Sequence, residues 1–237
     1  MEKNSILIMC GGRGKRLGKA AESLPKPLMK IGDRTILEHK LKRYSDSGFR
    51  NFVVCLGYKG GMIKEALKGL DFSGTCVFSD AGEPAGILKR LYVARELFRD
   101  TVILTYGDTY SAIDLGDLSR AHEEGGNEAT IVVAPIQNPF GIVEFDKENK
   151  VTSFTEKAVL NYYIGYAVIN KSALGLVPSG VIGMPDGEGL VAFYKILAEK
   201  RKLGVYYHAG LQITFNTRDE LEIARKKFSF YTMKEES

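Results

Sequence analysis

The chain has 237 residues, of which 44% are hydrophobic and 26% charged, a composition typical of one globular domain that excludes a disordered or fibrous protein. Its 33 basic and 29 acidic side chains leave a formal net charge of +4, which suits a phosphate-rich small ligand but is too small to indicate nucleic-acid binding. The longest apolar runs, such as residues 5–10, fall far short of the roughly 20 residues that span a bilayer, so we expect no membrane segment.

The first half of the chain predicts alternating strands and helices. Short runs rich in Val, Ile and Phe alternate with longer amphipathic stretches, a pattern typical of βαβ units and a mostly parallel sheet. One such stretch repeats Ile36, Leu37, Leu41 and Tyr44 at helical spacing. We expect strands at residues 5–9, 51–56, 75–79 and 101–105, and helices at 36–47, within 60–69, at 85–98 and at 115–124.

The second half predicts a change of pattern. Residues 129–134, 141–145, 151–156 and 164–170 indicate closely spaced strands, and the polar segment 146–149 indicates a hairpin turn. A helix at 190–200, a strand at 205–208 and a last helix at 218–228 follow. Because no Pro- or Ser-rich linker divides the chain, we predict a single domain over residues 1–237. Its fold class is α/β, with one Rossmann-like, mostly parallel sheet flanked by helices and a small antiparallel section in the C-terminal half.

The cysteines and the N-terminus indicate an ordinary cytoplasmic protein. Cys10, Cys55 and Cys76 lie in apolar, strand-like runs, where a free thiol behaves as a small hydrophobic side chain. A catalytic cysteine is disfavoured because none of the three histidines has a triad-like context. The first five residues are not followed by a signal-peptide pattern, so we expect the chain to stay in the cytoplasm.

A glycine-rich segment directly after the first predicted strand carries the sharpest functional signal. Glycines let backbone amides approach phosphate oxygens closely, and Arg16 and Lys26 supply the positive charge that a triphosphate requires. The segment is Cys10-Gly11-Gly12-Arg13-Gly14-Lys15-Arg16-Leu17-Gly18, followed by Leu24-Pro25-Lys26-Pro27-Leu28.

The same glycine spacing allows a dinucleotide-binding loop, because Gly12-x-Gly14 matches half of the Rossmann fingerprint. That class of protein needs an acidic residue at the end of the second strand to hold a ribose. The second strand here ends Cys55-Leu56-Gly57-Tyr58, so the sequence disfavours an oxidoreductase.

Asp108 follows an apolar strand and Gly107, which puts its carboxylate at the carboxyl edge of the sheet, where open α/β sheets bind ligands. A hard carboxylate oxygen suits a magnesium ion, which in turn gathers a triphosphate. The structural alternative is an aspartate that caps the next turn.

Together these motifs resemble the sugar-1-phosphate nucleotidylyltransferase family. The matching order is Gly-Gly-x-Gly-x-Arg-Leu at 11–17, Pro-Lys-Pro at 25–27, Gly-Asp at 107–108 and Phe-x-Glu-Lys at 154–157. Segments 104–108 and 151–157 are most similar to glucose-1-phosphate cytidylyltransferases, and the short length is similar to small sugar- or inositol-phosphate nucleotidyltransferases. The resemblance implies a nucleotide-binding part at 1–125 and an acceptor-binding part at 126–237.

The resemblance also implies residue roles. The catalytic set would be Arg16 and Lys26 on the donor triphosphate, Asp108 on Mg²⁺ and Lys157 on the acceptor phosphate. An exposed Glu-Lys pair at 156–157 is otherwise an ordinary solvated turn. The implied substrate-binding residues are Gly11, Gly12, Gly14, Gly86, Gly107, Gly141 and Glu156.

The sequence departs from the family pattern at several positions. Lys15 replaces the usual threonine before Arg16, and the base-loop segment 82–86 keeps only its last two residues, Ala-Gly. Tyr163-Ile164-Gly165 stands where Asn-x-Gly is common, so the acceptor contact of that asparagine is lost.

The second metal aspartate of the family has no acidic counterpart. It aligns with Thr214 in one register and with Asn216 in another. We predict Asn216 as the second protein ligand or an outer-sphere partner of the magnesium ion, because an asparagine carbonyl can coordinate this ion. An N-cap role for Asn216 or Thr217 is the alternative.

We therefore expect a magnesium-dependent nucleotidylyltransferase that joins a nucleoside triphosphate to a sugar 1-phosphate or a related phosphoester and releases pyrophosphate. The alternative is a nucleotide-sugar-binding protein that has lost catalysis. We expect no nucleic-acid or membrane partner. The nucleobase (CTP, GTP, UTP or dTTP) and the acceptor stay open, as does assembly into a homo-oligomer.

Overall fold

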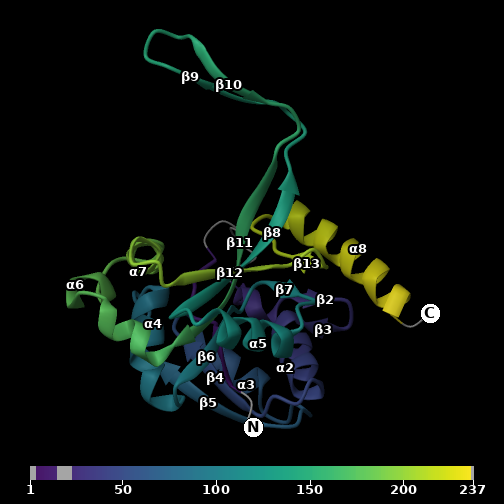
Figure 1. Ribbon diagram of the computed structural model, residues 1–237. Helices are drawn as coiled ribbons and strands as arrows, with labels where there is room; N and C mark the ends of the chain where they lie inside the picture. The colour runs from purple at the N-terminus through teal and green to yellow at the C-terminus, as the bar shows by residue number, and fades with distance from the viewer. Residues whose placement is uncertain (1–3, 15–22, 236–237) are drawn as a thin grey trace.

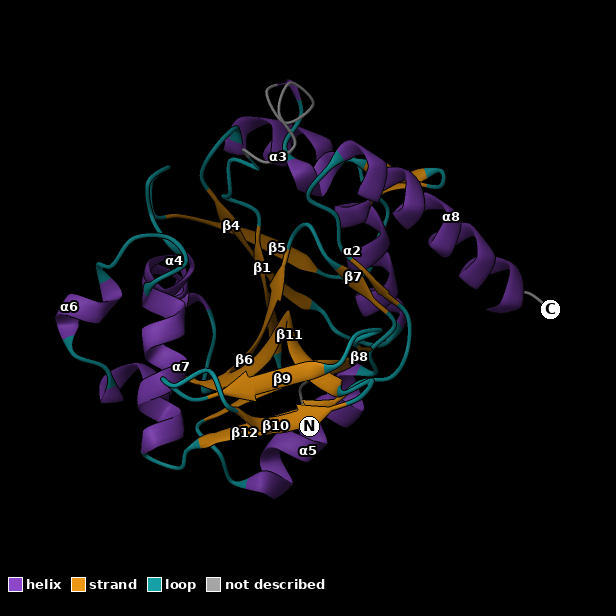
Figure 2. Ribbon diagram, turned by 90° about the horizontal axis from the view of Figure 1, so that it is seen from above, coloured by secondary structure: helices purple, strands orange, loops and turns teal. Residues whose placement is uncertain are grey.

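The first strand, β1 (Ser5–Met9), shows how the core is divided in the computed structural model, which describes residues 4–14 and 23–235. Ile6 and Ile8 pack in one apolar cluster, and Leu7 and Met9 pack in another. Side chains alternate across a strand, so a strand that is apolar at every position needs cover on both faces. The central sheet therefore lies between two layers of helices (Figures 1 and 2).

The seven strands of this sheet have the order β12-β8-β11-β6-β1-β4-β5. The block β6-β1-β4-β5 is parallel, β11 runs antiparallel to both of its neighbours, and β12 pairs parallel with β8. Besides β1, its members are β4 (Asn51–Leu56), β5 (Thr75–Asp80), β6 (Thr101–Tyr106), β8 (Ala129–Gln137), β11 (Val159–Asn170) and β12 (Leu203–Tyr207).

The helices cover the two faces separately. The cluster that contains Ile6 receives side chains from α2 (Ile36–Asp46), α3 (Gly60–Ala66) and α5 (Leu115–Gly125). The cluster that contains Leu7 receives them from α4 (Ile87–Ala94), α6 (Ser179–Ile182) and α7 (Gly189–Glu199). A third cluster packs α8 (Arg218–Glu235) against residues such as Ile31 and Phe215. None of the described helices is long and apolar enough to cross a membrane.

A two-stranded arm, formed by β9 (Ile142–Phe145) and β10 (Val151–Thr155), projects from the sheet (Figure 1). The predicted turn joins these strands, with the amide of Asn149 donating to the carbonyl of Asp146 at 3.1 Å. Because β8 runs parallel to β6, the arm leaves from the sheet edge at which β6 ends. The remaining short elements are β2 (Lys30–Ile31), β3 (Arg34–Thr35), β7 (Tyr110–Ser111) and β13 (Gln212–Ile213), with 3₁₀ helices at Lys26–Leu28, Arg95–Leu97 and Lys171–Leu176.

The predicted fold class is confirmed, and the differences concern element ends and short elements. The helix expected over 85–98 is α-helical only to Ala94 and continues as a 3₁₀ turn. β8 and β11 are longer than predicted because they pair with each other beyond the body of the sheet. The ladder of β7 and β13 was not predicted, since two residues are too few to show a period.

The packing predicts that Ile103→Ala in β6 destabilises the fold by about 2 to 5 kcal/mol, because Ile103 is fully buried and truncation leaves a cavity. Val205→Ala is the matched control, since Val205 lies on edge strand β12 and is 64% exposed. Its effect is expected within about 0.5 kcal/mol. Urea unfolding measures both, and equal losses in the two variants would contradict the assigned core.

Candidate active site

A cavity of about 820 Å³ opens at the carboxyl ends of β1 and β6. Sheets of this class bind their ligands at this edge. Another cavity, of about 700 Å³, lies at the opposite edge and is lined by none of the predicted site residues, so the first cavity is the candidate active site. The first is lined by Met9, Cys10, Gly11, Gly12, Arg13, Gly14, Lys26, Pro27, Glu83, Pro84, Ala85, Ile87, Arg90, Tyr106, Asp108 and Asp186.

The chain segments under this cavity are in close contact. The amide of Cys10 donates to the carbonyl of Cys55 at 2.9 Å, and the amide of Gly107 donates to the carbonyl of Met9 at 2.9 Å. A Cβ on Gly107 would lie 2.7 Å from that carbonyl and 2.9 Å from Pro27 Cγ, so only glycine fits there. Burial raises the pKa of the Cys10 thiol far above its usual range, which keeps it protonated and unsuited to nucleophilic attack.

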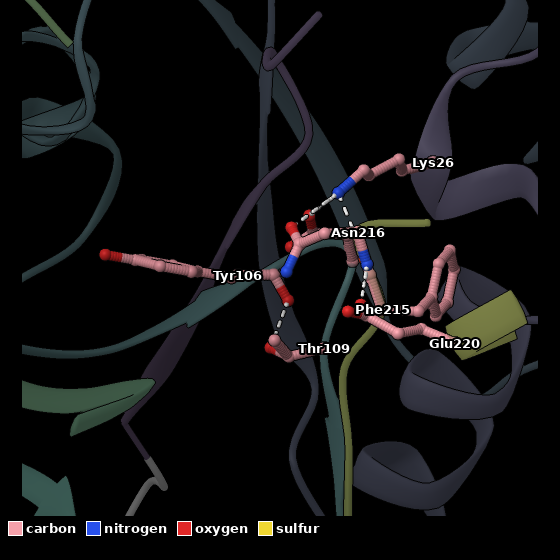
Figure 3. A network of polar contacts seen from close by, with 7 residues as sticks. Lys26, Tyr106, Thr109, Phe215, Asn216 and Glu220 are labelled. Atoms are coloured by element: carbon pink, nitrogen blue, oxygen red, sulfur yellow. Dashed lines mark hydrogen bonds and ion pairs between the residues drawn. The ribbon is translucent and has the colours of Figure 1, made fainter. Parts of the chain in front are cut away.

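Lys26 joins Asp108 to Asn216 at the floor of the site. Its Nζ lies 3.3 Å from Asp108 Oδ2, 3.3 Å from Asn216 Oδ1 and 3.1 Å from the carbonyl oxygen of Phe215 (Figure 3). Lys26 is only 6% exposed, and an ammonium group has three protons to donate, so these acceptors satisfy it. The β7–β13 ladder, in which Ile213 pairs with Tyr110, brings the C-terminal segment to this place.

The helix cap next to Asn216 is made by other side chains. Thr217 Oγ1 accepts from the amide of Glu220 at 3.2 Å, and the Glu220 carboxylate accepts from the amide of Asn216 at 2.6 Å. The side chain of Asn216 therefore points to Lys26 and does not cap α8 (Figure 3). Thr214 is exposed, and within the described part of the chain it makes no hydrogen bond to Lys26 or Asp108.

The donor set at this floor fits a magnesium ion that completes its coordination with phosphates and water. Asp108 and Asn216 offer one charged and one neutral oxygen, both within reach of the same ammonium group. Magnesium is usually held by one or two carboxylates plus substrate phosphates. Among the described residues, no group of three or more His, Cys, Asp and Glu side chains forms a site made of protein alone.

Arg90 on α4 is a buried residue of this site that the sequence analysis missed. Its Nη2 donates to the carbonyl of Gly11 at 3.3 Å and to that of Glu83 at 3.1 Å, and its Nη1 donates to the carbonyl of Leu56. A Cβ on Gly57 would lie 2.6 Å from Nη2 and 2.8 Å from the carbonyl oxygen of Gly11, and because that backbone atom cannot move aside freely, glycine is needed there. The available signal was helical spacing, which puts position 90 on the apolar face of α4.

Tyr106, which lines the cavity, is packed against Tyr163, and Tyr163 in turn packs against Tyr194. The rings of Tyr106 and Tyr163 meet edge to face at 5.9 Å, and the phenol oxygens of Tyr163 and Tyr194 lie 3.2 Å apart. Burial raises the pKa of Tyr106 to about 12 and also raises that of Tyr163, so both phenols stay neutral. Gly165 has a φ of 79°, and a Cβ there would lie 2.8 Å from the Tyr106 ring.

Several predicted residues lie elsewhere. Gly141 and Glu156 are neighbours at the base of the arm, because a Cβ on Gly141 would lie 3.3 Å from Glu156 Oε2. Lys157 follows with a φ of 49°. From Tyr166, which pairs with Thr105, β11 continues to Val159 over a length on the order of 20 Å at about 3.3 Å per residue.

These three residues therefore do not line the cavity. Gly86 lies at the start of α4, where a Cβ would lie 3.1 Å from Cα of Asp186, and is close to the wall formed by Ala85 and Ile87. Arg16 lies outside the described residues. The structure thus brings together Gly11, Gly12, Gly14, Lys26, Gly107, Asp108 and Asn216.

The fold is that of an α/β protein with a ligand-sized cavity at the carboxyl edge of its sheet, and comparison with known proteins shows its family. Residues 5–169 match the family model described as "Nucleotidyl transferase", so the chain belongs to this family. "Probable glucose-1-phosphate cytidylyltransferase" of Bacillus subtilis is 29% identical over 91% of this chain and 92% of its own length. "Mannose-1-phosphate guanyltransferase" of Pichia angusta is 29% identical over 83% of this chain and 56% of its own length.

A solved structure supports the fold independently. HddC from Yersinia pseudotuberculosis superposes with a TM-score of 0.73 over 95% of this chain and 100% of its own, at 20% sequence identity. At this level of identity the likeness extends to the fold alone.

The geometry at Asn216 predicts that Asn216→Asp strengthens magnesium binding while stability without metal changes little. The carboxylate adds a full negative charge beside Asp108, whereas the helix cap rests on Thr217. We expect the Mg²⁺ concentration for half-maximal thermal stabilisation to fall by up to about tenfold, the equivalent of about 1.4 kcal/mol.

Thr217→Ala is the control for the cap. It should cost about 1 kcal/mol of stability and leave the Mg²⁺ titration unchanged. An unchanged titration in Asn216→Asp would remove Asn216 from the metal site.

Proposed function

We propose that this chain is a magnesium-dependent nucleotidyltransferase that joins a nucleoside triphosphate to a sugar 1-phosphate or a related phosphoester, giving a nucleotide-activated sugar and pyrophosphate. The observation that carries the proposal is the meeting of Lys26, Asp108 and Asn216 at the floor of a glycine-lined cavity. The family match supports the transfer reaction, and the names of the relatives support sugar 1-phosphates as the acceptor class.

The reaction needs no covalent enzyme intermediate. An acceptor phosphate oxygen attacks the α-phosphorus in line, a new P–O bond forms, and the bond to the β-phosphate breaks as pyrophosphate leaves. The attacking phosphate is already ionised at neutral pH, so no general base is required. Catalysis then rests on positioning and on neutralising negative charge.

Different residues of the cavity would position the substrates and neutralise their negative charge. The Gly11–Gly14 loop brings backbone close to the phosphates, with Arg16 and Lys26 supplying positive charge. Asp108 and Asn216 would hold the magnesium ion, which when bound neutralises charge on the triphosphate. Lys26 already satisfies one acidic and two neutral oxygens, so exchanging one of them for a phosphate oxygen would keep it paired.

We assign donor binding to residues 1–125 and acceptor binding to residues 126–237, with Asn216 as the residue of the second part that reaches the donor site. The acceptor residues would be Gly141, Glu156 and Lys157 at the base of the arm. Tyr163, in place of a small amide side chain, makes this side of the site more aromatic, so we expect selectivity for acceptors that pack on a ring. A cytoplasmic location fits an enzyme that consumes nucleoside triphosphates.

The decisive experiment is a matrix of CTP, GTP, UTP and dTTP against hexose, heptose and polyol phosphates, read by pyrophosphate release with Mg²⁺. Release that depends on both substrates supports the transferase. A protein that only binds nucleotide sugars would release none while still showing thermal stabilisation by the product. That result would replace the proposal with the binding function, which the neutral Asn216 also allows.

Asp108→Asn is expected to remove most turnover and keep the fold. The side chain of Asp108 is 31% exposed at a strand end, so the change removes charge with little loss of packing. Loss of one preorganised electrostatic group costs about 2.7 to 4 kcal/mol in the transition state. Turnover above roughly a tenth of wild type at saturating Mg²⁺ would reject the metal role, and the melting temperature checks the fold.

Two lysine variants should separate the two substrates. Lys157→Ala is expected to raise mainly the Michaelis constant for the acceptor, whereas Lys26→Ala should weaken mainly the use of the triphosphate. Lys147→Ala, an exposed position in the turn of the same arm, is the control and should change neither constant. Unchanged acceptor kinetics in Lys157→Ala would remove the arm from the acceptor site.

A further inference from the structure

Lys40 on α2 is a fully buried lysine that the proposed mechanism does not use. Its Nζ donates to Thr105 Oγ1 at 2.7 Å, to the carbonyl oxygen of Thr109 at 2.6 Å and to Tyr166 Oη at 2.9 Å. Each of the three ammonium protons thus has an acceptor. No carboxylate pairs with Lys40 among the described residues.

A buried ammonium without a carboxylate is a poor way to stabilise a core. Its desolvation is costly, and an apolar side chain at the same position is often equally or more stabilising. Helical spacing confirms that position 40 faces the core, since it falls between Leu37, Leu41 and Tyr44. Unlike an apolar residue, Lys40 donates hydrogen bonds to three specific acceptors, and its role is therefore to be sought in those acceptors.

Two of those atoms flank Asp108. Thr105 lies three residues before Asp108 on β6, and Thr109 directly follows it. Thr109 also closes the turn, because its Oγ1 donates to the carbonyl of Tyr106 at 3.2 Å. The other side of the turn is fixed by the hydrogen bond from the amide of Gly107 to β1. Lys40 therefore clamps both ends of the turn that presents Asp108.

The third acceptor of Lys40 is the phenol oxygen of Tyr166. Tyr166 lies on β11, where it pairs with Thr105, and its phenol oxygen also receives a hydrogen bond from Tyr44 at 3.2 Å. Burial by itself raises the pKa of Tyr166, but the charge of Lys40 and the hydrogen bonds to the phenol oxygen outweigh it, so the pKa is lowered overall. This direction is the one that a charged ammonium in contact with the phenol produces.

We propose that Lys40 is a positioning residue that holds the Asp108 carboxylate in place for magnesium and triphosphate by clamping the two ends of its turn. This inference rests on the proposed function for its kinetic consequence. Its structural consequence, a turn that loosens when the ammonium group is removed, holds whatever the substrate is.

The experiment compares Lys40→Met with Lys42→Met, an exposed lysine on the same helix. Hydrogen exchange read by mass spectrometry over residues 105–111 measures the turn, and Mg²⁺ titration of the melting temperature measures the metal site. We expect residues 105–111 to exchange at least tenfold faster in Lys40→Met than in wild type, with the exchange of the rest of β6 unchanged. We also expect this variant to need about tenfold more Mg²⁺, with kcat lowered on the order of a hundredfold. Lys42→Met should match wild type.

A second pair keeps the test valid if Lys40→Met fails to fold. Thr105→Val removes one of the two acceptors beside Asp108 with a near-isosteric side chain, whereas Tyr44→Phe removes a hydrogen bond to Tyr166 and leaves all three acceptors of Lys40 in place. Faster exchange and a higher Mg²⁺ requirement in Thr105→Val, with neither in Tyr44→Phe, support the clamp.

Two outcomes would contradict the role of Lys40, and a third would contradict only the proposed function. Equal exchange and equal Mg²⁺ titration in Lys40→Met and Lys42→Met would overturn the clamp. So would equal effects of Thr105→Val and Tyr44→Phe, because a merely structural cluster treats them alike. If wild type released no pyrophosphate with any substrate pair, the proposed function would fail, while exchange and Mg²⁺ binding would still decide the role of Lys40.

Discussion

The ammonium group of Lys26 is the contact on which the arrangement of the site depends. It is nearly buried, so it must find acceptors, and those acceptors come from segments far away in the sequence: Asp108 after β6 and Asn216 before α8. Pro25 and Pro27 on either side of it restrict the backbone from which it projects. The β7–β13 ladder and the apolar packing of α8 bring the C-terminal segment near, and Lys26 then holds Asn216 beside Asp108.

Two further buried cationic side chains, Arg90 and Lys40, donate hydrogen bonds to backbone segments that form the same site. Arg90 holds the carbonyl oxygens of Gly11 and Leu56, and Lys40 holds that of Thr109. Each is satisfied by neutral oxygens, so its positive charge is not cancelled by a nearby carboxylate among the described residues. Charges in a low-dielectric interior act over longer distances than charges in water. The charges of Arg90 and Lys40 therefore act on a cavity that the carboxylates of Glu83, Asp108 and Asp186 also line.

Periodicity and motif order were enough to predict the sheet, its helical layers and the place of Asp108, because each of these follows from local sequence. They did not predict the ladder of β7 and β13, which forms through long-range contact between two-residue segments. The sequence also left open whether Asn216 caps α8. Only the positions of Lys26 and Thr217 decide that question. Helical spacing alone places Lys40 and Arg90 on the apolar faces of their helices. It could not predict their hydrogen-bond acceptors, because those carbonyl oxygens belong to other elements.

The residues proposed to bind the acceptor are held differently from those proposed to bind the donor. The proposed donor residues come from loops at the ends of buried parallel strands, where glycines such as Gly107 are required by close backbone contact. Gly141 and Glu156 lie instead at the base of an arm whose two strands pair only with each other. A two-stranded ribbon contributes little stability of its own, so its sequence is less constrained by the core. Variation in the acceptor can then arise along the arm and at Tyr163 without disturbing the contacts that hold Lys26 and Asp108.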